Sequence, residues 1–219
     1  SNEGVVLARV SDDKKFGAVV VLNCETDFVA KNEGFIRLTS NFLDLAISHR
    51  PAGLDALKAL LLDGRTVEAH VTEQTGIIGE KLDLSFYGSI EAASVVQYIH
   101  PGNRLATVVG FNKNVDEQTG KDVAMQIAAM NPVAVDKDDV PQNIVEKELE
   151  IAREKFRMEG KPENMLDKIA QGALQKFFKE STLLSQAFVK DNKMTIKEYL
   201  ASKDKGLTVT GFVRYGLGE

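Results

Sequence analysis

The sequence has 219 residues, of which 43% are hydrophobic, and its formal net charge is -5. This length can bury one large core or two modest ones, whereas the negative charge argues against general binding to nucleic acid phosphates. The single cysteine excludes an intrachain disulfide framework and favours a reducing compartment. No apolar run approaches the roughly 18 residues that span a bilayer, and the first residues lack a signal peptide pattern. We therefore expect a cytoplasmic protein with no membrane partner and no direct nucleic acid partner.

The first elements predicted along the chain are a hairpin and a helix. Residues 5–10 and 16–22 are apolar segments on either side of a polar turn, which predicts two antiparallel strands. Apolar residues then recur at helical spacing and predict an amphipathic helix that packs on the hairpin and ends at Pro51. The predicted apolar face consists of Phe35, Leu38, Phe42, Leu43, Leu45 and Ala46.

The following segment predicts a further short helix and two strands. Residues 54–62 are typical of the helix, and residues 67–71 and 81–87 are typical of strands joined by a loop at 75–80. Residues 76–81 superficially resemble a phosphate-binding loop. They lack its spacing and the Ser or Thr after the lysine, so we interpret them as a turn between strands.

A second hairpin and helix follow, so the first pattern repeats loosely. Residues 94–99 and 105–111 predict the strands, and residues 122–130 predict the helix, which ends at Asn131-Pro132. Residues 207–215 alternate like a strand and are predicted to return to this second sheet. This repetition indicates a duplicated subdomain.

Between the second helix and the last strand, apolar residues recur at spacings typical of a coiled coil. They predict an antiparallel helical hairpin whose tip is Gly160-Lys161-Pro162. With about two heptads in each helix, the hairpin is too short to stand alone and is expected to be anchored in the second subdomain. Its apolar positions are Val145, Leu149, Ala152, Phe156, Leu166, Ile169 or Ala170, Leu174 and Phe177.

These elements predict an α+β fold of two related subdomains, each an antiparallel sheet with helices on one side. We place the first subdomain at residues 1–88 and the second at residues 89–140 and 181–219. The helical hairpin at residues 141–180 is predicted to be an arm inserted in the second subdomain, and its charges are expected to be solvated.

The candidate site begins where the predicted strand ends. Thr26, Asp27 and Asn32 are turn and cap residues, which places Phe28 at the end of an element. An aromatic residue beside a charge is typical of an anchor at a protein interface. A phenylalanine also packs commonly on the core of its own protein. The position alone leaves both interpretations open.

Enzymatic chemistry finds little support in the sequence, because nucleotide loops, nucleophile elbows and paired metal ligands are missing. Cys24 is a candidate nucleophile with His49, His70 or His100 as base, but it follows an apolar strand and is interpreted as a buried structural thiol. We expect no enzymatic activity, no catalytic residue, no cofactor and no metal.

Residues 23–32 closely resemble the signature of elongation factor Ts, the bacterial nucleotide exchange factor for the GTPase elongation factor Tu. Further segments resemble that family in the same order, so the resemblance covers nearly the whole chain. These segments are residues 98–102, 123–129, 160–162 and 186–189. Many members begin with a small helical domain that does not precede the first strands here, and some carry a helical extension after the last strand.

The resemblance implies which residues contact elongation factor Tu. Phe28 is expected to act as a wedge between helices behind the nucleotide, and Asp27 to disturb the hydrogen bonds around the magnesium-holding segment. Further contacts are implied for Ile78 and Gly79, for His100 and for Val189. The neighbours Thr26 and Val29 complete the predicted partner-binding set.

The function implied is that of a guanine nucleotide exchange factor in translation elongation, in bacterial cytoplasm rather than an organelle. The oligomeric state stays open between a single chain, a homodimer and a two-plus-two complex with the GTPase. One alternative is a scaffold without exchange activity that binds through the arm at 141–180, while Phe28 packs inward. A third is a thiol enzyme that uses Cys24.

Overall fold

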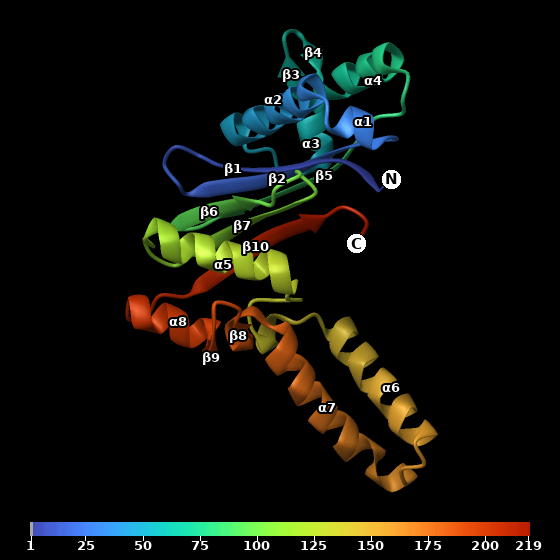
Figure 1. Cartoon of the computed structure of the whole chain (residues 1–219), viewed down its shortest axis with the longest axis vertical. Helices are drawn as coiled ribbons and strands as arrows, with labels where there is room; N and C mark the ends of the chain where they lie inside the picture. The colour runs from blue at the N-terminus through green and yellow to red at the C-terminus, as the bar shows by residue number, and fades with distance from the viewer. Residues whose placement is uncertain (1) are drawn as a thin grey trace. The chain divides into compact units, whose positions relative to one another are not determined.

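The computed structural model describes residues 2–219 and shows an α+β fold with antiparallel sheets, as predicted (Figure 1). Contacts within the chain divide it into two units. The first unit ends at Ala129 and resumes at Leu207–Glu219, whereas Met130–Gly206 form the second. The three-part division with boundaries at 88, 140 and 180 stays a prediction.

The first unit begins with a three-stranded antiparallel sheet in the order β1-β2-β5. In its register Val5 lies opposite Leu22, and Val6 lies opposite Val21. The hairpin predicted from the two apolar segments is therefore confirmed. The strands are β1 (Glu3–Val10), β2 (Phe16–Cys24) and β5 (Asp83–Glu91).

Several helices and a small hairpin connect β2 to β5 and cover the outer face of this sheet (Figure 1). The long amphipathic helix predicted there is confirmed, with Phe35, Phe42 and Ala46 buried. The connecting elements are α1 (Asp27–Ala30), α2 (Glu33–His49), α3 (Leu54–Ala59), β3 (Leu61–Leu62), β4 (Arg65–Thr66) and α4 (Val67–Ile78).

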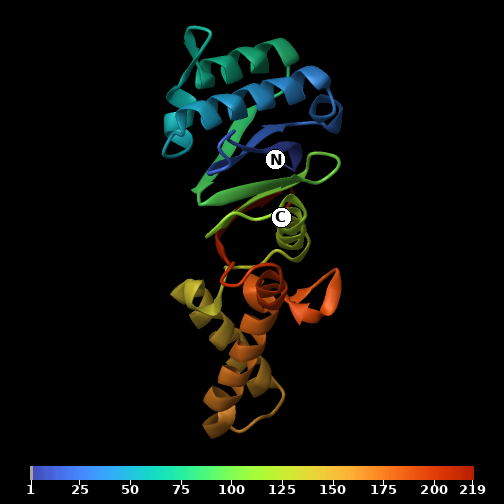
Figure 2. The same ribbon diagram turned by 90° about the vertical axis from the view of Figure 1, so that its left-hand side faces the viewer.

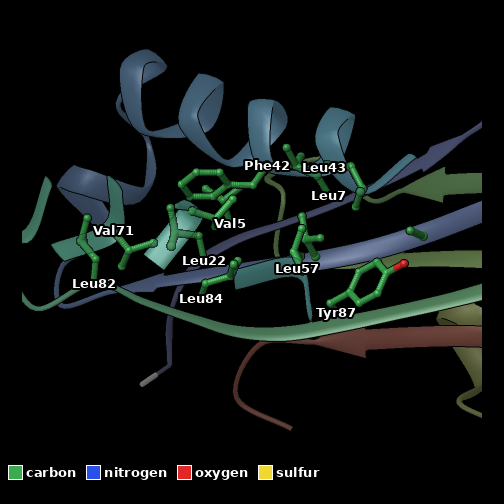
Figure 3. Packing of buried hydrophobic residues seen from close by; sticks show 14 of the residues in the cluster. Val5, Leu7, Leu22, Phe42, Leu43, Leu57, Val71, Leu82, Leu84 and Tyr87 are labelled. Atoms are coloured by element: carbon green, nitrogen blue, oxygen red, sulfur yellow. The ribbon is translucent and has the colours of Figure 1, made fainter. Parts of the chain in front are cut away.

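Strand β2 is buried along its whole length and contributes to two cores. Successive side chains of a strand point to opposite faces, so Val20 and Leu22 belong to the core beneath the helices, whereas Val19 and Val21 belong to the other. Figure 3 shows the core beneath the helices, where helix and strand side chains meet. Its labelled members are Val5, Leu7, Leu22, Phe42, Leu43, Leu57, Val71, Leu82, Leu84 and Tyr87.

The second core lies between the first sheet and another three-stranded antiparallel sheet, in the order β10-β7-β6. Helix α5 (Glu117–Met130) covers the outer face of this second sheet. The Thr107 hydroxyl of the sheet donates a hydrogen bond to the carbonyl of Ala124 in the helix at 3.0 Å. Figure 2 shows the resulting layers of this unit. The strands are β6 (Ser94–Ile99), β7 (Leu105–Phe111) and β10 (Val209–Gly216), so the predicted return of the last strand is confirmed.

Two predictions in the first half of the chain are wrong, and a third predicted element is shorter than expected. Residues 67–71 form the start of α4 rather than a strand, because the Thr66 hydroxyl accepts from the N–H of Ala69 at 3.0 Å and caps a helix. The predicted loop at 75–80 is largely the end of the same helix, which Gly79 terminates with a φ of 80°. The predicted helix at 54–62 ends at Ala59.

The second unit contains two long helices, a small hairpin and a short helix. An ion pair joins the two long helices near their connection, with Arg153 Nε 2.7 Å from Asp167 Oδ1. Ala152, Ala170 and Leu174 are buried; coiled-coil packing stays a prediction. The elements are α6 (Gln142–Met158), α7 (Leu166–Ser181), β8 (Ala187–Phe188), β9 (Asp191–Thr195) and α8 (Ile196–Lys203).

Within residues 2–219, none of the helices has the length and apolar character that crossing a membrane requires.

Substitution of Gly17 tests the packing between the two sheets. A Cβ atom there would lie 2.6 Å from Val95 Cγ1 and 3.3 Å from Val108 Cβ. We expect Gly17→Ala to lower the free energy of unfolding by about 1 to 3 kcal/mol through overpacking, measured by denaturant titration. Gly211→Ala is the control, because a Cβ at Gly211 meets nothing within 4 Å. Equal unfolding midpoints for the two variants would contradict this packing.

Candidate functional site

The chain leaves the buried strand β2 and immediately forms two capped helix starts. The Thr26 hydroxyl accepts from the N–H of Val29 at 3.4 Å and caps α1. The Asn32 side chain accepts from the N–H groups of Gly34 and Phe35, at 2.9 and 3.2 Å, and caps α2. These caps satisfy helix N–H groups that have no partner within the helix, and thereby fix the turn at residues 25–32.

This turn presents Phe28 to solvent. The Phe28 side chain is 83% exposed, whereas Phe35 and Phe42 in the following helix are 2% and 0% exposed. Val29 and Ala30, on the other side of α1, pack against the core. The interpretation in which Phe28 packs on its own core is therefore wrong, and the ring is available to a partner.

Asp27 lies beside this ring and is also exposed. Its carboxylate forms an ion pair with Lys31 one helical turn later, at 3.3 Å from Nζ. Both side chains are largely in water, so the pair contributes little to stability. A partner that offers a better hydrogen-bond donor can therefore bind the Asp27 carboxylate, and the lost pair with Lys31 lowers the stability of the protein little.

A shallow apolar hollow of about 230 Å³ lies next to Phe28. The end of α4 contributes Ile78 to it, and the preceding Ile77 is 67% exposed. The structure thus brings together Phe28, Val29 and Ile78, three of the residues predicted as partner contacts, with Gly79 directly following Ile78. The full lining consists of Phe28, Val29, Asn32, Phe35 and Ile78.

The carboxylate of Glu80 connects the end of α4 to the turn after β2. Its Oε1 accepts from the backbone N–H groups of Glu25 and Thr26, each at 3.0 Å, and its Oε2 accepts from the Thr26 hydroxyl at 2.7 Å. These bonds, led by the one from the hydroxyl, hold the pKa of Glu80 below its usual value. The sequence does not predict that Glu80 holds the turn, because it places Glu80 at the end of a loop between strands.

The His100 turn lies at the same end of the sheets as the Phe28 turn. Asn103 in this turn accepts a hydrogen bond from Val6 of β1 at 2.8 Å. Arg104 pairs with Glu3 at 3.0 Å, and Glu3 lies opposite Cys24 in the first hairpin. Figures 1 and 2 show α1 and the β6–β7 turn at this common end.

His100 itself is exposed, and its Nδ1 lies 2.8 Å from the hydroxyl of Tyr98. This contact orients the imidazole ring, and sequence reasoning had not singled out Tyr98. Val189 belongs to the second unit, where it lies between β8 and β9 and is 52% exposed.

Cys24 is buried at the end of β2, and its thiol donates to the carbonyl of Thr26 at 3.2 Å. Burial, assisted by the negative charge of Glu80, raises the pKa of Cys24 from 9.0 to about 11. His49 and His70 contact the carbonyls of Leu45 and Leu62 instead. These features disfavour a thiolate nucleophile.

Comparison with known proteins identifies related sequences. The profile of the family described as elongation factor TS matches residues 25–219. The protein named elongation factor Ts from Porphyromonas gingivalis is 56% identical over 216 residues, which are 98% of this chain and 78% of that protein. Elongation factor Ts from Christiangramia forsetii is 48% identical over 220 residues, covering 100% of this chain and 80% of that protein.

The two environments of phenylalanine in this region have different consequences for stability. We expect Phe42→Ala to lower the free energy of unfolding by about 3 to 5 kcal/mol, because it empties a fully buried position. We expect Phe28→Ala to change it by less than about 0.5 kcal/mol, because the ring is already in water. Denaturant titration of both variants measures this, and a large loss for Phe28→Ala would contradict the exposed placement.

The raised pKa of Cys24 predicts a slow thiol. At pH 8 the thiolate fraction in the folded protein is expected to be about 100-fold below that of the unfolded chain. Iodoacetamide should therefore modify Cys24 at least that much more slowly in buffer than in guanidinium chloride. Since the unfolded chain loses its proton first, the free energy of unfolding should fall as pH rises from 9.0 toward about 11. Rapid modification of the folded protein would contradict this.

Proposed function

Because the chain belongs to the elongation factor Ts family, and so has the general role of a translation elongation factor, we propose that it acts by guanine nucleotide exchange. In this proposal it binds the GTPase elongation factor Tu in the cytoplasm and promotes the release of GDP. The residues that weaken nucleotide binding are proposed to be Asp27 and Phe28, in the turn after β2.

The exposed ring of Phe28 is the observation that supports this site most directly. A phenylalanine that is 83% exposed has not contributed its hydrophobic free energy to folding. Burial of such a ring in a partner contributes roughly 1.5 to 3 kcal/mol. The turn that carries it is capped at both of its helix starts, so little ordering is required when the ring enters a partner.

The proposed activity is a binding equilibrium. A factor that binds the empty GTPase more tightly than the nucleotide-bound form must weaken nucleotide binding by the same ratio. Each tenfold change corresponds to about 1.4 kcal/mol, so Phe28 alone accounts for about ten- to hundredfold weakening. Asp27, the hollow beside Ile78, and His100 supply further differential contacts. Neither bond formation nor bond breakage is involved, so the proposal needs no catalytic residue and no cofactor.

A second candidate function is a scaffold that binds a partner through the arm and exchanges no nucleotide. Exposed apolar side chains on α6 favour it, since Met158 is 81% exposed and Ile151 is 49% exposed. A groove of about 360 Å³ between α6 and α7 includes Ile151. The scaffold alternative predicts that Phe28 packs inward, but Phe28 is exposed. Only the surface of the arm therefore supports the scaffold.

Release of a fluorescent GDP from elongation factor Tu tests the exchange proposal. We expect the unsubstituted protein to accelerate release on rapid mixing. Phe28→Ala should lower the second-order rate constant by about 10- to 100-fold, because the buried ring is lost from the complex. Asp27→Ala should also lower it, through loss of the carboxylate.

Leu61→Ala is the matched control, because Leu61 is an exposed apolar residue of the same unit at 63% exposure. It should leave the rate unchanged. If the unsubstituted protein does not accelerate GDP release, the exchange proposal is wrong. If Phe28→Ala retains the full rate, the role proposed for Phe28 is wrong. If the unsubstituted protein binds the GTPase without accelerating GDP release, and Met158→Ala weakens that binding, the scaffold is the better description.

A further inference from the structure

We propose that Glu80 is a positioning residue of the exchange site, whose carboxylate fixes the turn that presents Asp27 and Phe28. The inference rests on the proposed function, because it concerns how the same site is held. Glu80 is half-buried and is directed at the backbone of the turn. It therefore acts through Phe28 and Asp27.

The contacts of Glu80 use both of its oxygens. Oε1 accepts two backbone N–H groups, from Glu25 and Thr26, and Oε2 accepts the Thr26 hydroxyl. A carboxylate that accepts several hydrogen bonds forms short, charge-assisted contacts, which are stronger than neutral ones. The separation of 2.7 Å between Oε2 and the hydroxyl oxygen agrees with this description.

The two N–H groups lie where regular structure leaves a gap. Cys24 is the last residue of β2 and Asp27 is the first residue of α1, so Glu25 and Thr26 lie between a strand and a helix. Backbone N–H groups at such a position need a partner outside the regular elements. Glu80 supplies that partner for both residues.

Thr26 transmits the contact to the short helix. Its hydroxyl hydrogen goes to Glu80, while its oxygen accepts from the N–H of Val29 at 3.4 Å. One side chain thus joins Glu80 to the first turn of α1, which includes Phe28. A helix of four residues has few internal hydrogen bonds of its own, so its orientation depends on these contacts.

Glu80 also follows directly on the end of α4. Gly79 adopts a left-handed conformation with φ of 80°, and its N–H donates to the carbonyl of Thr75 at 3.0 Å. This helix end sets the direction from which Glu80 approaches the turn. Ile78, which borders the same hollow as Phe28, is consequently held beside the turn, and Gly79 follows it in the chain. A surface that is ordered before binding loses less entropy in the complex.

Amide hydrogen exchange on the free protein tests the contact itself. In Glu80→Ala we expect the amides of Glu25 and Thr26 to exchange at least about tenfold faster, since each loses a charge-assisted bond. The amides of β2 should keep their protection. Glu80→Gln retains one acceptor oxygen and should restore part of the protection. Glu91→Ala, at an exposed glutamate of β5, is the matched control. Unchanged exchange at Glu25 and Thr26 in Glu80→Ala would overturn the inference.

GDP release from elongation factor Tu then tests the consequence. Glu80→Ala should lower the second-order rate constant by about tenfold, and Glu80→Gln should recover part of it. Adding Glu80→Ala to a variant that already carries Asp27→Ala and Phe28→Ala should reduce the rate little further, because Glu80 acts through these two residues. Fully additive losses would overturn the positioning role and indicate direct contact with the GTPase. If the unsubstituted protein releases no GDP, the proposed function fails, whereas the hydrogen exchange result still decides whether Glu80 fixes the turn.

Discussion

The burial of β2 on both faces is the constraint on which the rest of the first unit depends. All nine residues of this strand are buried, and they alternate between the core beneath the helices and the core between the sheets. A shift of one residue would exchange the two sets of side chains, so the register is strongly determined. The residue at which the chain leaves the core, Glu25, is therefore determined as well, and the exposed turn follows from it.

The candidate site combines this fixed exit with two further connections at the same end of the sheets. The end of α4 approaches through Glu80, and the β6–β7 turn is tied to β1 by the hydrogen bond from Val6 to Asn103. Each connection is held by polar contacts to backbone groups, while Phe28 projects into water. An exposed apolar side chain on a backbone that is held by polar contacts is the combination expected of a preformed interface anchor.

The sequence predicted the elements whose periodicity was long and clear. Both hairpins, helix α2 and the return of β10 follow from alternating or helical patterns. The segment from Val67 to Val71 forms the start of α4, although the sequence predicts a strand, because a short apolar run fits either structure. The exposure of Phe28 could not be derived from its position, and the family resemblance alone favoured it as a contact. The role of Glu80 could not be predicted, because its partners, Glu25 and Thr26, are distant in the sequence.

The return of the last strand to the first unit has a consequence for how the protein folds during synthesis. Strand β10 completes the second sheet by pairing with β7, yet Met130–Gly206 are made between these two strands. On the ribosome the second sheet stays incomplete, with one side of β7 unpaired, until that whole segment and β10 have been synthesised. Such long-range pairing slows folding. The second unit, by contrast, is a continuous stretch and has all of its own contacts available before β10 emerges.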